Sequence, residues 1–585
     1  MTWTALAILL TAQIIGTRVP TMWAWGLNLG RFLTPAWTWI PFAAAGLLLV
    51  APLARVTGRA LDRADRTPGR ARDRADRIPG RGPADVVFPL AIAALVLALP
   101  DHLWFVGDFV QRAGTISSAR GFIANYPQSL PLDLFLHDTL TRWLMRALGG
   151  DVLVASRLLC ALEAALLAHL ALRFAREREL RGAAAFAVAT LVIGGAALFL
   201  TGDPKSASEQ WLLTTAIGVC GARLAQTGRG RMALAVLAAL FLTLHRVALL
   251  ALPPVLLAFA LAERAPDDAT RAPRAAWARA LPLALPAFAL LLIGPRIVGI
   301  LRGFDLRHHV APWVGSASLK GSNAHAMVIA LADRIQAVLV LAPLSLALPA
   351  LAIALGPGGG RRREGAVIAA LAAACGSILA FTAPQQSVFR DLDVYAPAGA
   401  ALSLLTAWLC TQVLRDRPAS WLAPALLVGV AAPTLQGMAH AHDLARGLTR
   451  VRAFVTEAPP RADRDRFTTF EFLADRYAQL QRWDAAEWAA HEAVAIAPSP
   501  RLIKEEGMAA TEAGHLEASR DAFRRLTARA PDDPFGWSRL AVVATRLGDR
   551  VEALRAADSL ERLSPDDGTA REVRDYWTRA GVSSR

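Results

Sequence analysis

Long apolar runs separated by short arginine-rich stretches occupy the chain up to about residue 440. An α-helix needs about 20 apolar residues to cross the roughly 30 Å hydrocarbon core of a bilayer, and several runs reach that length. Charged residues make up only 19% of the 585 residues, too few for the surface of a soluble protein of this size. The sequence therefore predicts an all-α, polytopic transmembrane domain with about 11 to 13 membrane segments. The predicted spans are 3–18, 35–54, 86–104, 152–174, 183–201, 207–225, 232–262, 281–299, 327–355, 365–383, 394–414 and 420–438.

Two of these segments depart from a simple span. The run 3–18 has no basic region before it, so we expect a retained short span rather than a cleaved signal peptide. The run 232–262 is too long for one ordinary span and carries His245 and Arg246 near its middle. We expect it to form a hairpin of two short helices that turns near the far side of the bilayer.

The basic loops predict the orientation of the spans, because cytoplasmic loops of membrane proteins are enriched in Lys and Arg. Residues 55–85 contain nine arginines, and DRADRTPGR at 62–70 recurs as DRADRIPGR at 73–81. This polar segment is expected to be disordered and cytoplasmic. Alternating the spans from there places the other basic stretches on the same side, namely 176–181, 228–231, 263–280, 360–363 and 415–417.

The same alternation places the loops 101–151, 202–206, 300–326 and 384–393 on the opposite side. The C-terminal domain follows them there. We therefore expect an integral protein of a bacterial-type inner membrane with an extracytoplasmic C-terminal domain. The predicted parts are N-terminal membrane segments (1–54), the basic loop (55–85), the main membrane domain (86–440), a linker (441–466) and the C-terminal domain (467–580).

The C-terminal domain has an internal repeat. Pro498, Pro531 and Pro565 lie 33 and 34 residues apart, and a small residue lies twelve positions before each. Small residues let paired helices approach, and the proline ends the second helix. The pattern resembles the tetratricopeptide repeat over roughly residues 467–580. The resemblance implies an α-solenoid with a concave surface for a protein or peptide partner, although the repeats could equally serve only to cap the membrane domain.

Several functional classes are disfavoured. The net charge of +15 comes mainly from arginines in short loops and C-terminal helices, without the interleaved aromatic residues of a nucleic-acid surface. The sequence thus predicts no nucleic-acid partner. The cysteines at 160, 220, 375 and 410 lie singly inside apolar runs and are expected to be packing residues. No nucleotide-binding motif occurs in a supporting context.

Acidic residues at the predicted outer surface are the main candidates for chemistry. Asp101 and Asp108 directly follow a span, with Trp104 between them at a position suited to the interface. Two carboxylates there can act as a general base and a positioning group for an acceptor hydroxyl. They could also be solvated loop acids or helix caps. The same loop carries Asp133, His137 and Asp138 on an otherwise apolar helical stretch.

These features together resemble the C-type glycosyltransferases, in particular their protein O-mannosyltransferase-like members, over roughly residues 86–440. The shared features are an acidic first outer loop, a Tyr-Pro stretch leading into an amphipathic helix, a hairpin with a central basic residue, and FRDLDVYAPAGAALSLL before a late span. Asp101 is followed by His102, whereas the mannosyltransferase branch has an adjacent Asp-Glu pair at this point.

The resemblance implies transfer of a sugar from a polyprenyl-phosphate donor to a hydroxyl acceptor at the outer leaflet. Asp101 or Asp108 would deprotonate the acceptor or orient it through a divalent cation. No other cofactor is implied. Arg246, with His245 beside it, would hold the lipid phosphate, because a charge within an apolar run usually has a polar role. Additional candidates for substrate binding are Lys205, Arg390, Asp391 and Asp393, of which the last three could instead form a local ion-pair cluster.

Two further interpretations remain open from the sequence. An O-antigen ligase-like or polymerase-like enzyme would also join many spans to C-terminal repeats, with catalytic Arg and His in a large late outer loop. The loop 300–326, which contains Arg307, His308 and His309, is short for that role. Adjacent histidines do not share a helix face, so no metal site is predicted there. A non-enzymatic membrane scaffold that recruits an envelope partner is the other interpretation.

Overall fold

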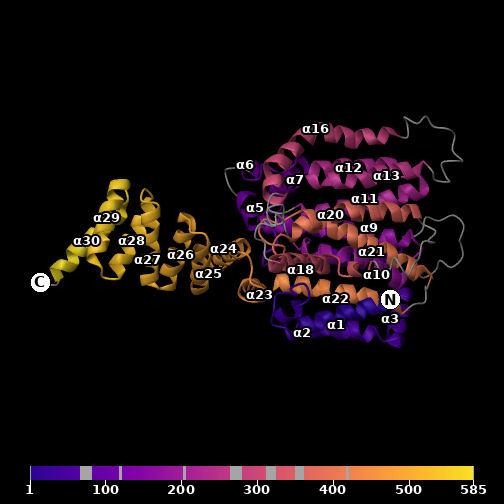
Figure 1. Ribbon diagram of the computed structural model, residues 1–585, viewed down its shortest axis with the longest axis horizontal. Helices are drawn as coiled ribbons and strands as arrows, with labels where there is room; N and C mark the ends of the chain where they lie inside the picture. Colours follow the sequence, from indigo (N-terminus) through magenta and orange to yellow (C-terminus); the bar gives the residue numbers. More distant parts are fainter. Residues whose placement is uncertain are drawn as a thin grey trace. The chain divides into compact units, whose positions relative to one another are not determined.

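The computed structural model describes residues 2–65, 82–107, 109–116, 122–201, 206–263, 280–310, 324–348, 362–416 and 421–583. The chain divides into two compact units, Met1–Thr449 and Arg450–Arg585. All regular structure within the described residues is helical. Figure 1 shows that the long helices of the first unit lie roughly parallel to one another as a bundle.

In the described residues, four α-helices and the short 3-10 helix η1 (Leu29–Phe32) precede the loop that carries Asp101. The four α-helices are α1 (Thr2–Gly16), α2 (Pro35–Leu48), α3 (Ala51–Ala64) and α4 (Ala84–Ala98). The loop itself contains α5 (Phe109–Ile116), α6 (Phe122–Asn125), α7 (Pro131–Leu134), the π-helix η2 (Phe135–Leu140) and α8 (Thr141–Leu148).

The remaining helices of this unit complete the bundle. They are α9 (Val152–Arg176), α10 (Gly182–Ile193) with η3 (Gly194–Leu198), α11 (Ala207–Thr227), α12 (Arg231–Leu244), η4 (Arg246–Ala251), α13 (Leu252–Ala262), η5 (Leu281–Leu283), α16 (Ala284–Ile300), the π-helix η6 (Leu301–Val310), α18 (Ala324–Leu341), η7 (Ser345–Ala347), α20 (Arg362–Phe381), η8 (Leu392–Tyr395), α21 (Ala396–Asp416) and α22 (Leu422–His442).

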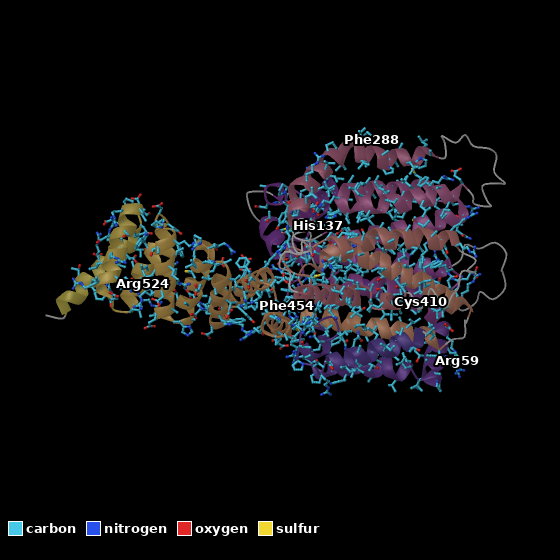
Figure 2. The ribbon with its side chains drawn as sticks, in the orientation of Figure 1. Arg59, His137, Phe288, Cys410, Phe454 and Arg524 are labelled. Atoms are coloured by element: carbon cyan, nitrogen blue, oxygen red, sulfur yellow. The ribbon has the colours of Figure 1, made fainter. Side chains whose placement is uncertain are left out.

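Within the part of the chain that the structure describes, five helical stretches are long and apolar enough to cross a membrane, or six if the bent pair α2–α3 counts as one. The five are Val152–Arg176, Leu281–Leu306, Arg362–Phe381, Leu392–Arg415 and Leu422–His442, and five shorter apolar helices accompany them. Large apolar side chains face outward around the bundle, among them Leu291, which is 74% exposed. Figure 2 shows that Phe288 also lies on the outer edge of the bundle, on α16. Such an apolar perimeter suits hydrocarbon rather than water, so the first unit is an integral membrane domain.

The run 232–262 folds as the predicted hairpin. The helix breaks at His245, whose backbone is extended, and the chain turns through η4 into α13. Arg231, the first residue of α12, lies 3.1 Å from the carboxylate of Glu263, which directly follows α13. The two ends of the run therefore meet, and His245 and Arg246 lie at the opposite end of the bundle.

Ion pairs join the predicted basic loops at one end of the bundle. Asp65 and Asp85 both contact Arg176, at 2.7 and 2.5 Å. Similar pairs are Arg178–Glu364 at 2.7 Å, Arg223–Glu177 at 3.5 Å and Arg415–Glu179 at 3.2 Å. The described parts of the stretches 55–85, 176–181 and 415–417 therefore lie at the same end of the bundle, as predicted, whereas most of 263–280 lies outside the described residues.

Some predicted boundaries are wrong. Residues 55–64 belong to the helix α3 rather than to a disordered loop, because Asp62 and Asp65 bond to the start of α10. The predicted span 327–355 ends as a helix at Leu341, and Pro343 follows it closely. The predicted linker 441–466 contains the helix α23 (Leu444–Thr456). The second copy of the arginine-rich repeat, 73–81, lies outside the described residues.

The second unit is a solenoid of paired helices, in which each helix packs against the next. The helices are α24 (Asp463–Gln479), α25 (Trp483–Ile496), α26 (Pro500–Ala513), α27 (Leu516–Arg529), α28 (Pro534–Arg546), α29 (Arg550–Leu563) and α30 (Gly568–Ser583). The small residues that define the repeat, Ala486, Ser519 and Ala553, are fully buried. Close approach of the helices explains why these positions stay small.

The turn inside each repeat uses the same backbone conformation. Gly514 and Gly548 have φ of +84° and +78°, and Gln481 occupies the equivalent position with φ of +56°. A left-handed conformation is easy for glycine but costs roughly 1–2 kcal/mol for a residue with a Cβ atom. The first repeat therefore keeps the geometry of the other two at an energetic cost.

We expect Gln481→Gly to increase the free energy of unfolding of the unit Arg450–Arg585 by about 1 kcal/mol, because it removes this strain at an exposed site. Chemical denaturation followed by circular dichroism would measure it. The reverse change, Gly548→Gln, should lower stability by a similar amount. A loss of stability in Gln481→Gly would contradict this account of the turn.

Candidate functional site

A cavity of about 370 Å³ with both charged and apolar side chains in its wall opens at the end of the bundle opposite the ion-paired loops. Its charged lining consists of two arginines, Arg112 and Arg246, and four acids, Asp133, Asp305, Asp391 and Asp393. Apolar side chains border the same cavity, including Leu249, Leu301 and Phe304. It thus brings charged groups next to surfaces suited to a lipid chain.

The structure brings together four of the residues predicted from the sequence. His245 and Arg246 from the hairpin turn line the cavity together with Asp391 and Asp393 from the segment before α21. These two regions are about 145 residues apart in the chain, and α20 joins them because it packs against both η4 and α21.

Two other predicted residues, Asp101 and Arg390, do not line the cavity. The Asp101 carboxylate accepts hydrogen bonds from the backbone N–H groups of Leu103 (2.7 Å) and Trp104 (3.1 Å), and it is not part of the lining. Arg390 is buried with its guanidinium 5.8 Å from the ring of Phe105. Asp108 and Lys205 lie outside the described residues.

Arg246 is fixed in the cavity wall by an ion pair. Its guanidinium donates to both carboxylate oxygens of Asp305 in η6, and the bond from Nη2 measures 2.7 Å. Its Nη1 lies 3.2 Å from Nε2 of His245. An arginine has five donor hydrogens in a rigid fork, so a guanidinium held on one side can still present donors to an anion.

A buried polar network runs from the cavity into the bundle. Nη1 of Arg112 lies 3.3 Å from Oδ1 of Asp133, which also lies 2.8 Å from Nδ1 of His137. Nε2 of His137 lies 3.0 Å from Oε1 of Glu209 in α11. Glu209 is in turn hydrogen-bonded to Glu163 in α9. The network therefore connects the wall of the cavity to two of the long helices.

Charges alternate along this network. Burial by itself lowers the pKa of His137, but the Glu209 carboxylate and the bonds to Asp133 and Glu209 raise this pKa to about 10. Burial opposes ionisation of Asp133, yet the charges of Arg112 and His137 hold its pKa well below the usual range. Both residues lie in the loop between α4 and α9, outside the spanning helices. His137 is thus an imidazolium at neutral pH, and Asp133 is a carboxylate with little basicity.

Local structure positions these groups. His137 lies in the π-helix η2 and Asp305 in the π-helix η6, and π-helical turns are rare and frequently occur at functional sites. Arg296 of α16 donates to the backbone carbonyls of Pro127 and Ser129, at 3.2 and 2.6 Å, and so holds the segment that leads to Asp133. Figure 2 shows His137 at the end of the bundle away from Arg59 of α3.

The sequence singles out Asp133 and His137 but misses their buried partners. Glu163 lies within the apolar run 152–174, and Glu209 opens the run 207–225. A carboxylate inside a predicted span is expensive unless it has a polar role, and this signal could have identified both. Asp138, next to His137, instead bonds to Arg142 at 2.7 Å and does not line the cavity. Among the residues that the structure describes, no group of three or more His, Cys, Asp or Glu forms a metal-binding cluster.

Comparison with known proteins adds no family to this description, since neither a protein-family model nor a curated protein matches the sequence.

Proposed function

We propose that the chain is a membrane glycosyltransferase that moves a sugar from a polyprenyl-phosphate donor to a hydroxyl acceptor. The observation that carries the proposal is the cavity itself, in which Arg246 and Asp393 line one space beside apolar side chains. A phosphate needs a cation, an acceptor hydroxyl needs a nearby base, and a polyprenyl chain needs an apolar border. The cavity offers all three at one end of a membrane bundle.

The roles follow from the contacts of each residue. Arg246 would bind the donor phosphate, and the apolar side chains of Leu301 and Phe304 would border the lipid. Asp391 already accepts a hydrogen bond from the backbone N–H of Gln386 at 2.8 Å, so we give it the role of holding the loop. Asp393 is then the preferred general base, in place of Asp101, whose carboxylate caps a turn.

The reaction would break the bond between the anomeric carbon and the phosphate oxygen and form a bond from that carbon to the acceptor oxygen. The acceptor proton would pass to Asp393, and the leaving phosphate would keep the electron pair. Arg246 would stabilise the charge that develops on the phosphate. In a site with little water, such a preorganised charge contributes more than it would in bulk solvent.

Purified full-length protein in nanodiscs, supplied with radiolabelled polyprenyl-phosphate hexose and a hydroxyl-bearing acceptor, would test the proposal. We expect transfer of the label to the acceptor and a loss of about 10²-fold or more in Asp393→Asn. Asp138→Asn removes a nearby carboxylate outside the cavity and should retain transfer.

Asp101→Asn in the same assay separates the two assignments of the base. Loss of transfer in Asp101→Asn, with normal transfer in Asp393→Asn, would make Asp101 the base and reject our choice. Failure of every hexose donor to react, with binding of the donor lipid also absent, would reject the glycosyltransferase and leave the scaffold interpretation.

A further inference from the structure

The acidic and basic side chains of the helix α3 lie on different faces of the helix. Its acids point into the protein. Asp65 pairs with Arg176 at 2.7 Å and accepts from the backbone N–H of Gly182 at 2.8 Å, while Asp62 accepts from the N–H of Ala183 at 3.2 Å. Its three arginines, Arg55, Arg59 and Arg63, are exposed. The outer surface of the helix is therefore strongly basic although its sequence contains both signs.

The arginines form one stripe, because their spacing of four residues repeats on one side of a helix. Next to this stripe lies a second exposed row that is apolar, with Leu53 45% exposed and Val56 59% exposed. The third face packs on the bundle, where Ala54 is fully buried. The helix α3 thus has three surfaces: one packs on the bundle, one is exposed and apolar, and one is exposed and basic.

The direction of α3 suits a membrane surface. The helix axis bends by 96° between α2 and α3. If α2 runs across the membrane, α3 therefore lies nearly parallel to the membrane surface. Arg59 lies at the edge of the bundle on this end (Figure 2). A helix in the interface can bury an apolar row among acyl chains while its arginines reach the phosphates.

The other arginines at this end contrast with those of α3. Arg173 and Arg223 both contact Glu177, and Arg415 contacts Glu179. Each of these three arginines thus has a carboxylate within ion-pair distance, and Arg173 and Arg223 share one. The stripe on α3 has its own acids turned away, so its charge is directed outward.

We propose that α3 is an interfacial helix that binds anionic phospholipid headgroups of the adjacent leaflet through Arg55, Arg59 and Arg63. Charge complementarity selects anionic over zwitterionic lipid, and the apolar row places the helix at the depth of the headgroups. The site is independent of the cavity at the other end of the bundle.

Photo-crosslinking in nanodiscs tests the proposal on the full chain. Diazirine-bearing phosphatidylglycerol and phosphatidylcholine serve as probes, and labelled peptides covering 51–64 are quantified by mass spectrometry. We expect the phosphatidylglycerol probe to label α3 preferentially, and the triple variant Arg55→Gln/Arg59→Gln/Arg63→Gln to lose about tenfold or more of that labelling. The triple lysine variant should retain it, because the charge is kept.

A matched control changes net charge equally at the same end. Arg173→Gln/Arg223→Gln/Arg415→Gln removes three arginines with carboxylate partners and should leave the labelling of α3 within about twofold of wild type. Raising the salt concentration should weaken labelling of the unmodified protein, which checks the charge dependence without any substitution. Equal labelling by both probes, or unchanged labelling in the α3 triple variant, would overturn the proposal.

Discussion

Removing the Arg246–Asp305 pair through the double change Arg246→Gln/Asp305→Asn is expected to reduce sugar transfer by about 10²–10³-fold while the protein stays folded. Loss of one preorganised charge at a developing anion typically costs that much in kcat. The double change removes both members of the ion pair, so it does not leave the Asp305 carboxylate without its cation. Transfer assays at saturating donor, together with size-exclusion profiles, would measure the effect.

The single variants show whether Arg246 binds the donor phosphate or only stabilises the cavity wall through its pair with Asp305. Arg246→Lys keeps a charge but loses the planar fork, so we expect it to retain more transfer than Arg246→Gln. Asp305→Asn keeps the arginine and should be milder than the double variant. Arg142→Gln is a matched control, because Arg142 pairs with Asp138 outside the cavity. If the double variant keeps wild-type transfer, Arg246 does not hold the donor phosphate.

Replacing His137 with Gln is expected to lower the free energy of unfolding of the membrane unit by about 3–5 kcal/mol. The imidazolium lies between Asp133 and Glu209, and its removal leaves both buried carboxylates without their shared cation. Thermal unfolding in detergent, followed by loss of helical signal, would measure the change. Asp138→Asn breaks the partly exposed pair with Arg142 and should cost at most about 1 kcal/mol.

The pH dependence of stability gives an independent check on the same histidine. The folded-state pKa of His137, about 10, exceeds its unfolded value, so the stabilisation is complete below about pH 6.5 and declines as pH rises toward 10. Wild-type protein should therefore lose stability between these values, and His137→Gln should lose less over the same range. A similar slope in both proteins would mean that His137 is not the charged centre of the network.

Local patterns in the sequence were sufficient for the type of each element. Runs of about 20 apolar residues predict spanning helices, because the thickness of the bilayer imposes that length, and five of the predicted runs form helices long and apolar enough to cross a membrane. The 33–34-residue spacing of the prolines predicts the helical pairs of the second unit, since small residues at fixed offsets determine how the pairs pack. The break at His245 was also predictable from a charge in the middle of an overlong run.

Tertiary structure alone decided which acids share a site. Asp101 has the position in the sequence expected of a base, yet its carboxylate accepts hydrogen bonds from the N–H groups of Leu103 and Trp104. Asp133 and Glu209, 76 residues apart, are joined through His137 because α9 and α11 pack together beneath the loop. The direction of a side chain depends on how neighbouring helices pack and on competing backbone donors, and neither is encoded in local periodicity. The sequence by itself therefore determined the helical class of the two units and the repeat of the second, whereas packing determined several helix limits and the cavity.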